Sequence, residues 1–220
     1  MSSASVPSAR RAPALSRKQL IWFAVIVVAL AALSRGVKVV DINAAAAANP
    51  KAFSAADYGK SEFPKVQAAI EKRAVPAGTL AAALAANSAE ASQKYGVPVP
   101  GGVGPEMPVS FTGVVGTGTD GVYAVKVAGV PSDLLIRVQT GPAINGTDLR
   151  DATGTITFGQ FTNQIAYQNA GSALNDQLKQ QVLSKIGTGS LTGKTISIVG
   201  TFQLINPKGW LITPVTLSVQ

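Results

Sequence analysis

Three charged side chains that could act together lie within four residues of one another, Asp148, Arg150 and Asp151, in the stretch GTDLRDATGTITFGQFTNQ (146–164). A pair of carboxylates is the usual equipment for hydrolysing a glycosidic bond, with one group as acid and the other as base or nucleophile. An adjacent guanidinium lowers the pKa of a carboxylate, which suits a salt bridge better than a general acid. The pattern therefore favours a structural ion pair of Asp148, Arg150 and Asp151. A glycan hydrolase that uses Asp148 or Asp151 is the alternative.

Polar and aromatic side chains accompany this stretch and allow two interpretations. Asn163 and Gln164 are typical of a helix start, where such side chains satisfy free backbone N–H groups. They are also typical of a ligand site, in which amide and guanidinium groups bind sugar hydroxyls beside an aromatic stacking surface. In that second interpretation the ligand-binding residues are Arg150, Asn163, Gln164, Tyr167 and Trp210.

The sequence has no cysteine and no histidine. This excludes thiol chemistry, disulfides, thiolate or imidazole metal sites and every catalytic triad that uses histidine. No acidic cluster has the spacing of a calcium loop, and the glycine-rich stretch 116–121 lacks the context of a phosphate-binding loop. We therefore expect no metal and no cofactor, and we favour a protein that is not an enzyme.

Residues 20–33, LIWFAVIVVALAAL, form an uninterrupted apolar run preceded by four positive charges. A run of this length after a basic segment is typical of an export signal, since a full bilayer span needs about 20 residues. Arg35 and Lys38 follow directly and disfavour cleavage, so we favour an uncleaved membrane anchor over residues 20–34. This predicts an inner-membrane protein with a cytoplasmic tail and a body in the periplasm or extracytoplasmic space.

The charge of the chain is concentrated at its N-terminus. Six of the 19 basic residues precede residue 39, and the remainder carries 13 basic against 11 acidic residues. Binding of single-stranded nucleic acid needs a basic groove with interleaved aromatic side chains. A nearly neutral body in a chain with 6% aromatic residues predicts no nucleic-acid partner.

Changes in composition divide the chain into three parts. Residues 1–38 form a basic tail and anchor, residues 39–108 a stalk with short helices, and residues 109–220 a β-rich domain. Within the second part, helices are predicted to begin at Ser61 and Thr79, where the apolar periodicity follows a capping residue.

The pattern of the third part is strands, one long helix, then strands. Asp120-Gly121 predicts a two-residue hairpin, and the stretch GTITFGQF (154–161) is predicted as the fourth strand. A helix is expected over 162–186, and the last two strands meet at 206–209. This order predicts an α+β fold: an N-terminal anchor helix and short helices, followed by an OB-like small β-barrel with one long helix.

The same segments carry a family resemblance. GPAINGTDLRDATGTITFGQFTNQIAYQNAGSALN, LTGKTISIVGTF and WLITPVTL resemble a bacterial family of predicted periplasmic lipoproteins of unknown function. The resemblance begins at about Lys38 and is strongest at 141–142, 149–151, Phe158, 161–164 and 213–215. Members are often encoded beside sugar ABC transporters. The resemblance therefore implies an accessory role in carbohydrate uptake, with a transporter component or a carbohydrate as the partner, and it supplies no catalytic residues.

One departure from the family pattern affects membrane attachment. Such lipoproteins carry a lipidated cysteine just after the apolar run, whereas this chain has LSRGVKVV there and no cysteine anywhere. Retention at the membrane must therefore rest on the apolar segment itself. Together these patterns predict an exported, membrane-tethered accessory or binding protein.

Overall fold

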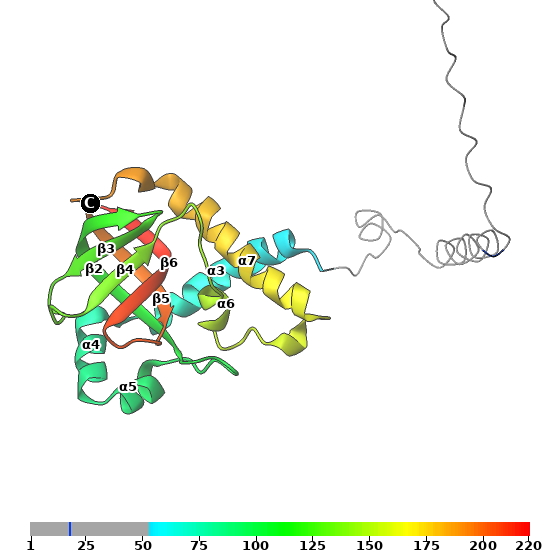
Figure 1. Ribbon diagram of the computed structural model, residues 1–220, viewed down its shortest axis with the longest axis horizontal. Helices are drawn as coiled ribbons and strands as arrows, with labels where there is room; N and C mark the ends of the chain where they lie inside the picture. Colours follow the sequence, from blue (N-terminus) through cyan, green and yellow to red (C-terminus); the bar gives the residue numbers. More distant parts are fainter. Residues whose placement is uncertain (1–17, 19–52) are drawn as a thin grey trace, which may run out of the picture. The chain divides into compact units, whose positions relative to one another are not determined.

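The computed structural model of the chain describes Lys18 and residues 53–220, and five strands of the described part close into a small barrel (Figure 1). In chain order these strands are β2 (Glu106–Thr119), β3 (Val122–Val127), β4 (Leu135–Gln139), β5 (Thr195–Gln203) and β6 (Gly209–Val219). A two-residue strand, β1 (Val75–Pro76), pairs in parallel with β2 outside the ring.

Closure depends on β2, which is long enough to pair with a neighbour on each side. Its first part runs antiparallel to β5, from Glu106 opposite Gln203 onward, and its second part runs antiparallel to β3. β4 lies beside β3, and β6 completes the ring by pairing in parallel with β4 and antiparallel with β5. This is the strand arrangement of an OB-like barrel, so the predicted fold class is confirmed for the described residues.

Two local features bend the strands into the ring. The β2–β3 register shifts between Val115 and Gly118, and the β5–β6 register shifts between Val199 and Gly200. At Gly200 the backbones approach so closely that a Cβ atom would lie 2.6 Å from the carbonyl oxygen of Thr213. A glycine is required there because bulges of this kind bring two backbones together.

Five α-helices of the described part surround the barrel. They are α3 (Ala55–Arg73), α4 (Ala77–Ala86), α5 (Ser88–Tyr95), α6 (Asp148–Asp151) and α7 (Gln164–Gln181). Helices α3 and α7 lie side by side (Figure 1), and at their contact a Cβ on Gly59 would lie 2.8 Å from the carbonyl oxygen of Ala173. The described portion of the predicted stalk, from Phe53 on, thus belongs to the same compact unit as the barrel.

The predicted helix starts at Ser61 and Thr79 are wrong. Helix α3 begins at Ala55, because the Ser54 hydroxyl accepts a hydrogen bond from the N–H of Asp57, and it continues through Pro64. The second predicted helix is two helices, since Asn87 is extended and its side chain caps α5 by accepting the N–H of Glu90.

The predicted strand at 154–161 is also wrong. Thr153 accepts the N–H groups of Thr155 and Ile156 at 3.1 and 3.3 Å, and a short 3₁₀ turn follows at Phe158–Gln160. Side chains that satisfy the backbone locally in this way compete with a sheet ladder. The predicted Asp120-Gly121 hairpin is confirmed, with both residues at positive φ (53° and 77°) between β2 and β3.

None of the helices in residues 53–220 has both the length and the apolar character that crossing a bilayer requires. The predicted anchor at 20–34 lies outside the described residues.

Candidate functional site

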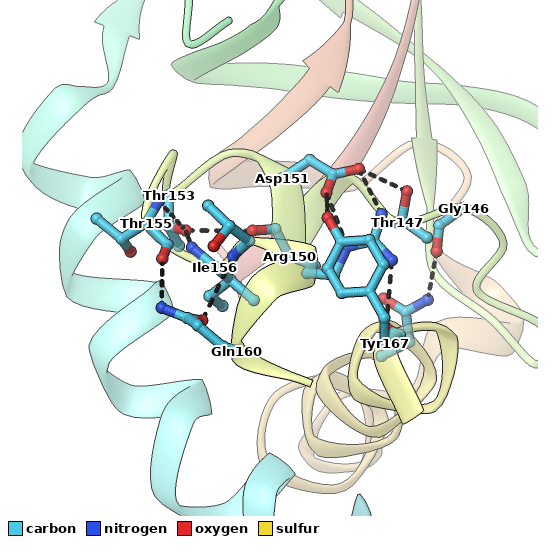
Figure 2. Close-up of polar contacts among 11 residues, drawn as sticks. Gly146, Thr147, Arg150, Asp151, Thr153, Thr155, Ile156, Gln160 and Tyr167 are labelled. Atoms are coloured by element: carbon cyan, nitrogen blue, oxygen red, sulfur yellow. Dashed lines mark hydrogen bonds and ion pairs between the residues drawn. The ribbon is translucent and has the colours of Figure 1, made fainter. Parts of the chain in front are cut away.

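Arg150 and Asp151 form a bidentate ion pair at the end of α6 (Figure 2). The Arg150 Nε and Nη2 groups donate to Oδ1 and Oδ2 of Asp151 at 2.8 and 3.0 Å, and both side chains are 9% exposed. Thr147 donates to Asp151 Oδ2 at 2.7 Å, which holds the carboxylate from the other side. Fork-to-carboxylate geometry of this kind is the strongest form of ion pair that side chains make.

Tyr167 of α7 connects this ion pair to the long helix. The guanidinium carbon of Arg150 lies 3.7 Å from the centre of the Tyr167 ring, and Nη1 donates to the Tyr167 carbonyl at 3.3 Å. The Tyr167 hydroxyl points to Asp151 Oδ1 at 3.5 Å, so three residues close a ring of contacts between α6 and α7. Burial raises the pKa of Tyr167 above its ordinary value, with the Arg150 charge acting in the opposite direction.

An aromatic cluster continues from Tyr167 to the start of α3. It consists of Phe53, Tyr58, Phe158, Phe161 and Tyr167, whose neighbouring rings lie 5.3 to 5.8 Å apart in tilted or edge-to-face arrangements. Such arrangements are the favourable ones for aromatic pairs. Burial raises the pKa of Tyr58 to about 12, and the charge of Glu62 adds to this rise. Phe158 is 51% exposed and is the ring of the cluster that faces solvent.

A pocket of about 440 Å³ lies against these residues, and we call it the Arg150 pocket. Its lining includes the charged pair Arg150 and Asp151, the rings of Phe158 and Tyr167, and residues 98–100. A concave site of this size, with mostly apolar walls and a few fixed polar groups, is typical of small-ligand sites. The pocket therefore brings a guanidinium, a carboxylate and two rings together in one place.

Two further carboxyl groups lie close to the ion pair. Glu106 is 1% exposed and accepts a hydrogen bond from the Thr201 hydroxyl at 2.8 Å, while Asp148 accepts one from Thr213 at 2.7 Å. Burial, and after it the charge of Asp148, raises the pKa of Glu106 to about 9. Burial also raises the pKa of Asp148 to about 6, against the hydrogen bond from Thr213. Glu106, Asp148 and Asp151 are thus close enough for their charges to affect one another.

The site residues predicted from the sequence differ in their contacts and burial in the structure. Arg150 and Asp151 pair with each other, whereas Asp148 turns to Thr213 instead of joining the ion pair, because α6 aims it at β6. Trp210 is fully buried in the barrel and stacks on Phe202 with ring centres 4.6 Å apart, so its prediction as a stacking surface for a ligand is wrong. Its indole N–H donates to the Pro207 carbonyl at 3.1 Å.

Asn163 and Gln164 lie at the start of α7, outside the lining of the Arg150 pocket. The Asn163 side chain accepts the N–H of Ala166 at 2.8 Å, which is the helix-capping interpretation of this residue. Gln164 is exposed as the first residue of the helix.

Asn163→Ala is expected to lower the free energy of unfolding by about 1 kcal/mol, because the cap on α7 is lost. Chemical denaturation of the two proteins measures this difference. Asn163→Asp keeps the acceptor and is the matched control. A loss in the aspartate variant as large as in the alanine variant would contradict the capping role.

The sequence patterns assign no ligand-binding role to Phe158, Tyr58 or Glu106. Phe158 is among the positions that carry the family resemblance, but it lies in the stretch that is predicted as a strand. Glu106 lies in a proline- and glycine-rich stretch with no chemical pattern, and only the β2–β5 pairing brings it to Thr201. Within residues 53–220 no group of three Asp or Glu side chains is placed to hold a metal ion.

The barrel and its pocket define an OB-fold type of protein. A crystal structure of an OB-fold protein from Thermotoga maritima is similar to this chain, with a TM-score of 0.61 and 21% sequence identity over 77% of this chain and 100% of that one. Residues 26–218 match the family described as "Predicted periplasmic lipoprotein (DUF2291)", and the chain belongs to that family. A search among curated proteins gave no match.

The family description places the chain in the cell envelope, on the periplasmic side. The term lipoprotein implies a lipid on cysteine, and none of the 220 residues is a cysteine. No residue of this sequence can therefore carry that modification.

Proposed function

We propose that this protein is a membrane-tethered, non-enzymatic binding protein of the periplasm that takes a carbohydrate-related ligand in the Arg150 pocket. The observation that supports the proposal most is the pairing of an exposed ring, Phe158, with a fixed guanidinium in one concave site. Sugars present apolar faces that stack on rings and hydroxyl groups that accept hydrogen bonds, and this pocket supplies a partner for each.

The hydrogen bonds of the ion pair favour binding over hydrolysis. Asp151 already accepts from Arg150 twice, from Thr147 and from Tyr167, so its two oxygens have no free position for a reacting proton. Arg150 uses three of its five N–H groups, two toward Asp151 and one toward the Tyr167 carbonyl, and keeps two for a ligand acceptor. Asp148 is committed to Thr213.

The remaining parts of the proposal concern attachment and partners. Residues 20–34 are proposed to hold the protein in the inner membrane, because they form an apolar run after a basic tail. A transporter component that receives the carbohydrate is the proposed partner, in keeping with the family resemblance and with the periplasmic description.

A ligand screen with the full chain in detergent micelles tests the proposal. A bound sugar is expected to raise the melting temperature by mass action, and at 100 times the Kd the stabilisation is about 2.7 kcal/mol. Phe158→Ala is expected to weaken that sugar about tenfold in calorimetry, because the stacking ring is lost.

Ile205→Ala is the control, since Ile205 is an exposed aliphatic residue in the β5–β6 connection and does not line the Arg150 pocket. Equal affinity in the Phe158 and Ile205 variants would place the ligand elsewhere. Conversion of the sugar to a hydrolysis product would favour the enzyme interpretation instead.

A further inference from the structure

A second, larger pocket lies beside the loop that connects β3 and β4, where these two strands no longer pair, and we call it the sheet-face pocket. It encloses about 690 Å³, compared with about 440 Å³ for the Arg150 pocket, and the two have no lining residue in common. Its floor comes from β3 and β4 and its rim from the loop 128–134 that connects them. It is therefore an independent site.

The lining of the sheet-face pocket is mostly apolar, with two hydroxyl side chains, Thr117 and Ser132, and a single charge. Val127, Val130, Pro131 and Leu134 contribute apolar surface, and Lys126 is the one charged residue in the lining. Lys126 is exposed and forms no ion pair with another residue of the described part. An apolar hollow with one cation at its solvent side matches a molecule that has an apolar chain and one negative group.

The strand register extends this pattern beyond the pocket. Lys126 lies opposite Val114 of β2, and Arg137 lies opposite Ala124 on one side and Leu211 on the other. Val114 and Leu211 are 47% and 38% exposed, so aliphatic side chains lie beside both cations on the surface of the sheet. Cations and exposed aliphatic groups thus alternate across the sheet, with no carboxylate in the lining of the pocket.

We propose that the sheet-face pocket binds an anionic single-chain amphiphile, with the acyl chain along Val127, Val130 and Leu134 and the head group on Lys126. Charge complementarity selects a negative head group, because the lining offers a cation and no acid. The volume of about 690 Å³ is within the range of pockets that enclose small molecules, so the hollow has room for an acyl chain. A long-chain carboxylate has both properties.

The test uses the full chain in phosphatidylcholine nanodiscs and a photoactivatable diazirine analogue of dodecanoate. After illumination, the labelled peptides are identified by mass spectrometry. Labelling is expected within residues 124–136, with saturation on titration and with competition by unlabelled dodecanoate but far less by dodecanol. Labelling confined to residues 20–34, or labelling that dodecanoate does not compete, would overturn the proposal.

Two variants and one control separate the head-group contact from general hydrophobic binding. Lys126→Met and Leu135→Asp are each expected to reduce labelling of 124–136 by about fivefold, since one removes the cation and the other adds a repelling charge. Lys72→Met changes an exposed lysine of α3 and should leave labelling unchanged.

Leu135 is 49% exposed, so its replacement leaves the core intact, and unchanged melting temperatures verify this for each variant. Labelling of Lys126→Met at the wild-type level would also overturn the proposal.

Discussion

Arg150→Ala is expected to lower the free energy of unfolding by about 3–5 kcal/mol, because it leaves a buried carboxylate without its partner. Arg150 and Asp151 are both 9% exposed at the side chain, so water cannot replace the lost guanidinium at low cost. The change also removes the cation that lies over Tyr167 and the hydrogen bond to its carbonyl. Chemical denaturation at pH 7 measures the loss.

An exposed ion pair on α7 provides the control. Lys179 and Asp176 pair at 2.6 Å with side chains 39% and 56% exposed, and Lys179→Ala should cost less than about 1 kcal/mol. Arg150→Lys keeps the charge but cannot reproduce the two parallel bonds to Asp151, so it is expected to fall between wild type and alanine. Equal stability of the Arg150→Ala and Lys179→Ala proteins would contradict a structural role for Arg150.

Glu106→Gln is expected to stabilise the protein at neutral pH. In the folded chain, burial foremost and then the charge of Asp148 raise the pKa of Glu106 from 4.5 to about 9. Below pH 4.5 the group is protonated in both the folded and the unfolded chain. Above it the unfolded chain loses the proton while the folded chain keeps it, so the free energy of unfolding falls as the pH rises toward 9, by up to about 1.4 kcal/mol per pH unit.

Glutamine removes this ionisation and keeps an oxygen that can accept the Thr201 hydroxyl. The Glu106→Gln protein should therefore lose less stability than wild type between pH 5 and pH 8, in denaturation curves recorded at each pH unit. Glu71→Gln, at an exposed position of α3, should follow the wild-type curve. A Glu106→Gln protein whose stability falls with pH as steeply as that of wild type would show that Glu106 is ionised in the folded state.

The parts of the fold that could be predicted from the sequence are those set by neighbouring residues. The Asp120-Gly121 turn needs two residues that accept positive φ, and both are visible in the sequence. Asn163 begins α7 because its own side chain satisfies the first turn. The order of strands and helix around these signals is enough to select an OB-like barrel.

Some errors have local causes, namely the Ser54 cap on α3 and the Thr153 hydrogen bonds, and others arise where distant packing decides. Ile165 is an apolar residue in the first turn of α7, yet it is 69% exposed, and the contact of α7 with α3 is made by small residues such as Ala173 beside Gly59. Tryptophan is a residue type on which ligands often stack, but the position of Trp210 in β6 directs its side chain into the barrel. Residue type alone contains no information on which side of a closed sheet a ring will face.

For the same reason, the ion pair of the candidate site could be predicted from the sequence but the aromatic cluster could not. Arg150 and Asp151 are adjacent in sequence, so their pairing is a local property. The aromatic cluster joins Phe53 and Tyr58 to Phe161 across about a hundred residues, and only the packing of α3 against α7 brings them together.

The pairing of β2 with β5 also determines when the protein can fold. Glu106 lies opposite Gln203, so the seam of the barrel joins residues that are nearly half the chain apart. A chain delivered to the periplasm from its N-terminus presents β2, β3 and β4 well before the strands that complete the ring. Folding is therefore coupled to complete delivery, and until β5 arrives the long first strand keeps an open edge that can pair with other chains.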